Sequence, residues 1–123
     1  MKDKGAKSYE RLLHIHRAIE QIEAFIRDVD EQTFLADPII SSAVLFQFSV
    51  IGEAVIHIDE RLLAKYDYPW HKVRAFRNLI SHAYFDIKLE AVWNIITNDL
   101  AGIKQIVGTI LTNEFRFQMD NDK

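Results

Sequence analysis

The chain has 123 residues, with 49% hydrophobic residues, four glycines, two prolines and no cysteine. This size and apolar content predict a single domain, 1–123, and the lack of cysteine excludes disulfides, thiolate metal sites and a cysteine nucleophile. A net charge of −3 argues against a general nucleic-acid coat, since such domains are usually basic. We expect a cytoplasmic protein, since a chain without cysteine suits a reducing compartment. We expect no membrane span, because neither a signal core nor a run of about 18 apolar residues occurs.

The first predicted helix runs from about Ser8 to Asp28, with Ser8 as its N-cap. We expect 1–7 and 118–123 to be flexible ends. Apolar residues recur along the helix at steps of three and four, which is the pattern of an amphipathic helix with one buried face. The residues that form this stripe are Leu12, Ile15, Ile19, Ile22 and Ile26.

The second predicted helix runs from Pro38 to about Tyr66, after a short turn over 33–36. Asp37 is a suitable N-cap, and Pro38 suits the first helical position. Apolar residues occur nearly all round this helix, so we expect it to be buried on most sides. In so small a domain, packing against a second subunit is the simplest way to bury these apolar residues. The sequence therefore predicts a homodimer with this helix near the interface, where Gly52 would allow close backbone approach.

The third and fourth predicted helices run from about Trp70 to Ala83 and from about Lys88 to Thr112. The segment 115–117 could add a short fifth. The result is an all-α, up-and-down bundle of four long helices. The segment 65–82 carries four Lys or Arg residues and one acid, a local charge of +3 on an acidic chain. This asymmetry is typical of a surface that binds an anionic partner.

Candidate chemistry concentrates in the segment from Arg77 to Tyr84, which reads Arg-Asn-Leu-Ile-Ser-His-Ala-Tyr. Arg77 and His82 are five residues apart, or roughly 140° around an ideal α-helix, so they do not share a face. They could meet one substrate if the helix ends near His82 or if a second copy contributes. The alternative is a surface helix with an ion-paired Arg77 and a solvated His82.

The five histidines do not predict a metal site. His14 and His16 are two residues apart and diverge around their helix. Glu53 and His57 are one turn apart and could share a ligand, but the other helices offer few inward acids to complete a metal site. We therefore expect Glu53 and His57 to form a polar pair, and we expect no metal or cofactor.

The segment from Arg77 to Tyr84 resembles the Arg-x-x-x-x-His-x-Tyr motif of HEPN-domain toxins of the HepT type. Three further segments resemble that family in the same order, so the resemblance covers roughly residues 9–111. These segments are Ile51–Ala54, Tyr68–Trp70, and Val92–Trp93 followed by Asn98–Leu100.

This resemblance implies a dimeric, metal-independent ribonuclease that is the toxin of a toxin–antitoxin pair. Arg77 and His82 would be catalytic, with Asn78 and Ser81 in support. The partners would be RNA and a minimal nucleotidyltransferase (MNT-type) antitoxin, which would neutralise the toxin by transferring AMP to Tyr84. DNA is not an expected partner. The alternative function is a non-catalytic, nucleotide- or partner-binding subunit of a minimal nucleotidyltransferase complex.

Overall fold

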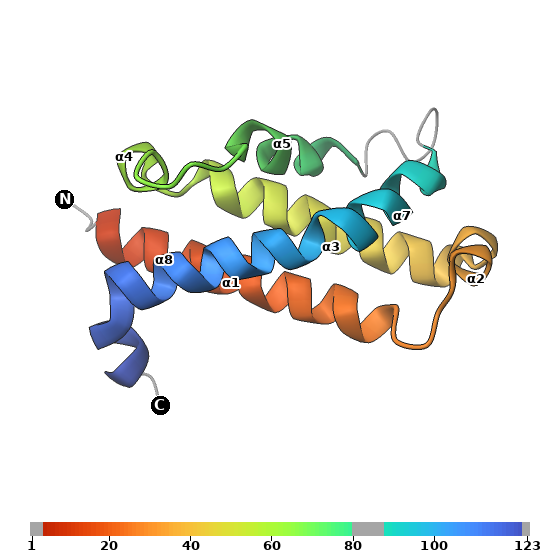
Figure 1. Ribbon diagram of the computed structural model, residues 1–123, viewed down its shortest axis with the longest axis horizontal. Helices are drawn as coiled ribbons and strands as arrows, with labels where there is room; N and C mark the ends of the chain where they lie inside the picture. Colours follow the sequence, from red (N-terminus) through yellow and green to blue (C-terminus); the bar gives the residue numbers. More distant parts are fainter. Residues whose placement is uncertain (1–3, 80–87, 122–123) are drawn as a thin grey trace.

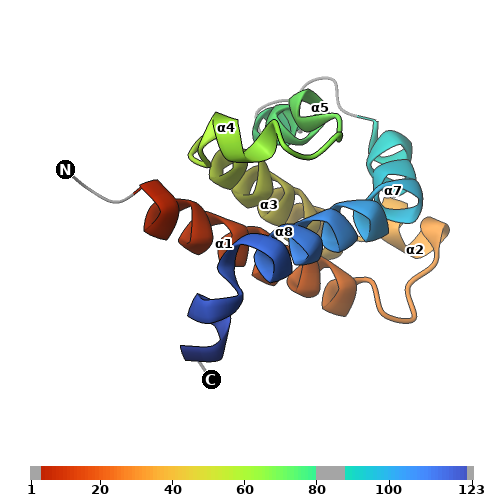
Figure 2. The ribbon, with the colours of Figure 1, turned by 60° about the vertical axis from the view of Figure 1, so that its left-hand side comes forward.

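The computed structural model describes residues 4–79 and 88–121, and within these ranges the regular structure is entirely helical. Figures 1 and 2 show α1, α3 and α8 side by side, with α5 against α3 and the short α2 and α7 at one end. The all-α fold is therefore confirmed. The elements in chain order are α1 (Lys4–Phe25), α2 (Glu31–Ala36), α3 (Pro38–Ile56), α4 (Glu60–Leu63), α5 (Trp70–Ala75), η1 (Phe76–Asn78), α7 (Leu89–Asn98) and α8 (Leu100–Asn121).

The core lies where α1, α3 and α8 face one another. Each of these helices contributes aliphatic side chains that are almost wholly withdrawn from solvent, and each such burial contributes about 1.5–3 kcal/mol relative to exposure. The predicted stripe of the first helix is confirmed from Leu12 to Ile22. The most deeply buried side chains of the three helices include Leu12, Ile15, Ile19, Ile22, Val44, Phe48, Ile51, Val55, Ile103, Val107 and Ile110.

The helix ends differ from the predicted ones. Ser8 does not cap α1: it lies inside that helix, is 1% exposed, and its Oγ accepts a hydrogen bond from the Asp59 amide at 3.0 Å. The helix ends at Phe25, and the chain then turns at Asp28, which has a φ of 60°. Asp is one of the few non-glycine residues that tolerate this left-handed conformation.

Two predicted long helices are each divided by a break. The second one ends at Ile56 because Asp59 acts as a new N-cap, accepting from the Arg61 amide at 3.0 Å, and starts the short α4. The fourth one is interrupted at Asp99, between α7 and α8. Phe115 then bends α8 with non-helical backbone angles. By contrast, the start predicted at Asp37 and Pro38 is confirmed, with Asp37 accepting from the Ile39 amide at 2.9 Å.

Helix α3 has one buried face and one exposed apolar stripe. Ile39 and Phe46, seven residues apart, are 81% and 54% exposed. By length and composition alone, with a mean hydropathy of 1.9, α3 could also cross a membrane, although the sequence predicted no membrane span. The core helix of a folded domain meets the same criterion. The single chain thus buries only part of the apolar surface that the sequence places on this helix.

Candidate functional site

Arg77 lies on a 3-10 helix rather than on the α-helix that the sequence predicts. The α-helical part of this segment ends at Ala75, and η1 continues from Phe76 to Asn78. Trp70 and Val73 of α5 and Phe76 of η1 are the buried residues of this segment. The rest of the predicted helix, after Leu79, lies outside the described residues.

Two aromatic contacts fix this segment on the bundle. The indole nitrogen of Trp70 donates to the carbonyl oxygens of Leu63 at 3.1 Å and Tyr66 at 3.2 Å. The ring of Phe76 packs edge-on against Phe48 of α3, with the ring centroids 5.0 Å apart. A buried aromatic ring of this kind anchors the backbone of the residue that follows it. The position of Arg77 is therefore set by its neighbour in the core.

Gly52 brings the backbone of η1 directly against α3. A β-carbon at this position would lie 2.9 Å from the Arg77 Cα and from the Phe76 carbonyl carbon, and closer still to the Arg77 amide nitrogen. Real β-carbons do not approach backbone this closely, so only glycine fits without movement. The close approach that we expected between two subunits at Gly52 is thus a contact within one chain, and it positions Arg77.

The exposed Arg77 side chain borders a groove between α1, α3 and η1. The groove has a volume of about 400 Å³. From α1 come Arg11 and His14, and from α3 comes Glu53. The remaining lining residues are Ser49, Val50 and Ala54. The groove is thus lined by two guanidinium groups, one from α1 and one from η1, and by the imidazole of His14. Its volume is large enough for part of an extended ligand.

On its other side Arg77 borders a second hollow, also of about 400 Å³. His71 and Arg74 of α5 and Asn78 of η1 line it, together with Ile56 and Ala75. Among the described residues, no acid belongs to this lining. Arg77 therefore lies between two hollows in which basic side chains predominate, and this arrangement suits an anionic ligand.

The charges around Arg77 are not neutralised by ion pairs within the described part of the chain. Neither Arg77, Arg11 nor Arg74 forms a salt bridge with a described carboxylate. Glu53 is the acid in the groove lining, and its Oε2 lies 2.9 Å from Nε2 of His57, one turn further along α3. This contact confirms the expected polar pair. Within 4–79 and 88–121 the expectation of an ion-paired Arg77 is not met, so its guanidinium can bind a phosphate.

The predicted site residues divide into two groups. Arg77 and Asn78 are adjacent, exposed residues of η1. Ser81, His82 and Tyr84 lie outside the described residues. The sequence reasoning missed Arg11 and His14, which are 66 and 63 residues before Arg77. Their three-residue spacing on one helix was a signal of a shared face, but nothing in the sequence indicated that this face meets Arg77.

The described residues contain no group of three or more His, Cys, Asp or Glu side chains that could hold a metal ion. His14 and His16 have different surroundings, as their spacing predicted. His14 lines the groove, whereas Nδ1 of His16 lies 3.4 Å from Glu20 on the same helix.

A separate hollow of about 330 Å³ lies between α5, η1 and the junction of α7 with α8. It is mainly apolar, and Tyr68 and Asp99 are among its lining residues. Burial, and to a lesser extent the Asp99 charge, raise the pKa of the Tyr68 hydroxyl. Because Arg77 does not border this hollow, it is a less suitable site for an anion.

Residues 15–110 match the family model described as ribonuclease HepT-like. A candidate RNase from Methanocaldococcus jannaschii is 33% identical over 104 residues, which cover 80% of this chain and 86% of that protein. The probable ribonuclease HepT of Thermococcus cleftensis is 31% identical over 91 residues, 73% of this chain and 83% of that protein.

Another M. jannaschii protein, named for both a gamma-glutamylcyclotransferase and a candidate RNase, is 28% identical over 109 residues. This chain spans only 48% of that protein. No solved structure matches the chain. The structure is an all-α bundle in which Arg11, His14 and Arg77 line one groove. The chain belongs to the HepT-like ribonuclease family, whose members share the HEPN fold, and its enzyme class is therefore ribonuclease.

Proposed function

We propose that this chain is a metal-independent endoribonuclease toxin that acts in the cytoplasm, with Arg77 and His82 as its catalytic residues. The observation that carries the proposal is the exposed Arg77 guanidinium, held between two basic hollows without a described carboxylate partner. Asn78, next to it on η1, can orient a phosphate oxygen. The resemblance of the motif adds His82 to the site, with Ser81 in support.

The proposed chemistry needs only side chains and the RNA itself. A base removes the proton of a ribose 2′-hydroxyl, the 2′-oxygen bonds to the adjacent phosphorus, and the bond from phosphorus to the 5′-oxygen breaks. The departing 5′-oxygen takes up a proton. An imidazole such as that of His82 titrates near neutral pH and suits either proton transfer. Arg77 stays charged and would stabilise the extra negative charge on the phosphorane.

The proposed active site is composite, formed across a homodimer. Ile39, Phe46 and Glu53 recur every seven residues, which places them on one face of α3. The first two form the exposed apolar stripe, and the third lines the groove. A second copy packed on that stripe through a two-fold axis would bring its own groove close to the first. Two copies of the motif would then share one cleft. Arg77 of one copy and His82 of the other could contact the same substrate, although the two residues do not share a face of one helix.

We further propose that a nucleotidyltransferase antitoxin neutralises this toxin by transferring AMP to Tyr84. Tyr84 follows His82 by two residues in the sequence. An AMP group carries a negative phosphate, and Arg77 would attract it as it attracts RNA. The modified tyrosine would therefore compete with the substrate for the same cation. Co-expression with the antitoxin should add the mass of one AMP to the peptide that contains Tyr84, and Tyr84→Phe should remain toxic in its presence.

The test of the catalytic proposal is cleavage of labelled RNA by pure protein in excess chelator. Wild type should cleave, and His82→Ala should lose about 10²–10⁴-fold in rate, the usual contribution of a general acid or base. Full activity of folded His82→Ala would overturn the proposed role of His82. Absence of RNA cleavage by the wild type, together with tight nucleotide binding, would favour the alternative, a non-catalytic subunit of a nucleotidyltransferase complex.

A further inference from the structure

Helix α1 carries a basic stripe made of Lys7, Arg11 and His14. The spacings of four and three residues place these side chains on one face of the helix. His14 is exposed, and Lys7 and Arg11 are half-buried. At 1.5 Å per residue the stripe is about 10 Å long. That is the length of about three stacked nucleotides at 3.4 Å each.

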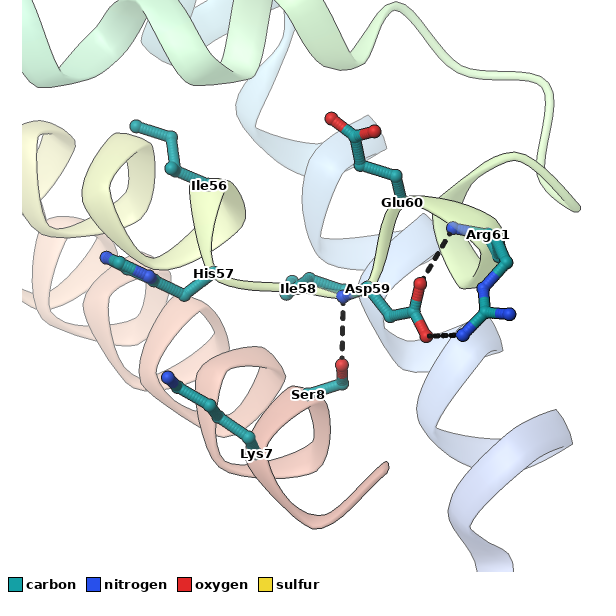
Figure 3. Close-up of a pocket in the computed structure, with 8 residues that line it drawn as sticks. All are labelled: Lys7, Ser8, Ile56, His57, Ile58, Asp59, Glu60 and Arg61. Carbon is teal, nitrogen blue, oxygen red and sulfur yellow. Dashed lines mark hydrogen bonds and ion pairs between the residues drawn. The ribbon is translucent and has the colours of Figure 1, made fainter. Parts of the chain in front are cut away.

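This stripe borders the same hollowed face as Arg77. Arg11 and His14 line the groove that Arg77 also lines. Lys7 lines a third hollow, of about 420 Å³, near the end of α3. Figure 3 shows Lys7 and His57 pointing to one side of that hollow, away from Arg61. Ile56 lines both this hollow and the one beside Arg74, and Arg77 lines both that second hollow and the groove.

The two acids of this third hollow, Asp59 and Glu60, point away from Lys7 (Figure 3). Asp59 pairs with the Arg61 guanidinium at 3.5 Å and also accepts from the Arg61 amide. Within the described residues no salt bridge joins Lys7 or Arg11 to a carboxylate.

We propose that Lys7, Arg11 and His14 bind backbone phosphates of the RNA that flank the cleaved bond. The inference deepens the proposed ribonuclease function, on which it rests. Phosphate contacts of this kind fix the position of a strand without reading its bases. The α1 stripe would therefore strengthen binding of any single-stranded RNA long enough to reach from Arg77 to Lys7, and a dinucleotide would not benefit.

The test measures binding of a labelled single-stranded RNA of mixed sequence at several salt concentrations. Using His82→Ala as the background keeps the RNA intact. Adding Lys7→Gln and Arg11→Gln should weaken binding about tenfold, the size expected when charged hydrogen bonds are lost. The slope of log K against log salt should also fall by about 1.4, since each lost phosphate contact on a single strand contributes about 0.7. Gln preserves helix propensity, so the variant should fold.

The matched control is Arg27→Gln with Arg116→Gln, which removes the same charge from exposed positions outside the three hollows. This control should bind RNA as the background does. Equal weakening in both double variants would overturn the proposal, because net charge alone would then explain the effect. Unchanged RNA binding by the α1 variant, with loss of antitoxin binding, would also overturn it and assign the α1 stripe to a protein partner.

A second measurement separates this inference from the proposed catalysis. In the chain with His82 intact, the α1 variant should raise KM about tenfold on a long RNA and leave kcat nearly unchanged, since the lost contacts lie away from the reacting atoms. Cleavage that survives His82→Ala would refute the catalytic proposal while the binding result still stood. A fall in kcat alone, with KM unchanged, would contradict the proposed role of the α1 stripe.

Discussion

The cations along α8 and those around Arg77 have different surroundings. Nζ of Lys104 lies 2.9 Å from Glu23 of α1, and Nζ of Lys65 lies 3.3 Å from Glu114 of α8. Each pair joins segments that are far apart in the sequence. Arg77 and Arg11 also come from distant segments, but they line one groove and no described carboxylate pairs with either.

This difference suggests different roles for the two sets of charges. The Glu23 carboxylate raises the pKa of Lys104, so that ammonium stays charged and bound to its partner. Such a pair connects α8 to α1. A guanidinium beside a groove, with no carboxylate partner among the described residues, adds nothing comparable to the fold and can bind a phosphate. We therefore expect changes on the α8 side to affect stability and changes around Arg77 to affect activity.

A large effect should come from Phe46→Glu, which places a charge on the exposed stripe of α3. The variant should become monomeric and lose about 100-fold in RNA cleavage, because the second copy no longer completes the cleft. Light scattering and cleavage assays measure the two effects. Phe117→Glu is a matched control, since Phe117 is 75% exposed on α8. A fully active Phe46→Glu monomer would show that the site is complete in one chain.

A smaller effect should follow from Gly52→Ala, which forces η1 away from α3. The clash is with backbone atoms, so we expect a loss of about 1–3 kcal/mol in the free energy of unfolding. Displacement of Arg77 should also reduce cleavage. Gly108→Ala is the control, because a β-carbon there meets nothing within 4 Å, and alanine favours a helix. Denaturant titration would contradict this account if both variants were as stable as wild type.

The smallest effect concerns acid stability and Glu114. The Tyr66 hydroxyl donates to Glu114 at 2.9 Å, and this bond, with Lys65 nearby, lowers the pKa of the carboxyl. A lowered pKa in the folded state stabilises the fold above the ordinary glutamate pKa, and that contribution is lost as the pH falls through the lowered value. Thermal melts should therefore show a slightly steeper fall in Tm below about pH 4 for wild type than for Glu114→Gln. If Tm fell with pH at the same rate in both proteins, this role of Glu114 would be contradicted.

The sequence predicted the all-α fold and the helix start at Asp37 because apolar periodicity and capping are local properties. It did not predict the breaks at Asp59 and Asp99, since both interrupt apolar patterns that read as continuous. The motif predicts Arg77 as a candidate site residue, and the structure places it beside two hollows. The contributions of Arg11 and Gly52 could not, because both depend on how α1 and η1 pack on α3.

The most direct test compares two cations, Arg77 and Lys104, in one RNA-cleavage assay. Arg77→Ala should lose about 10²–10³-fold in kcat/KM, the loss typical when a donor to developing charge is removed, and should keep its Tm. Lys104→Met should cleave RNA at the wild-type rate with a slightly lower Tm. Equal activities of the two folded variants, both near wild type, would contradict the assignment of the Arg77 face as the ribonuclease site.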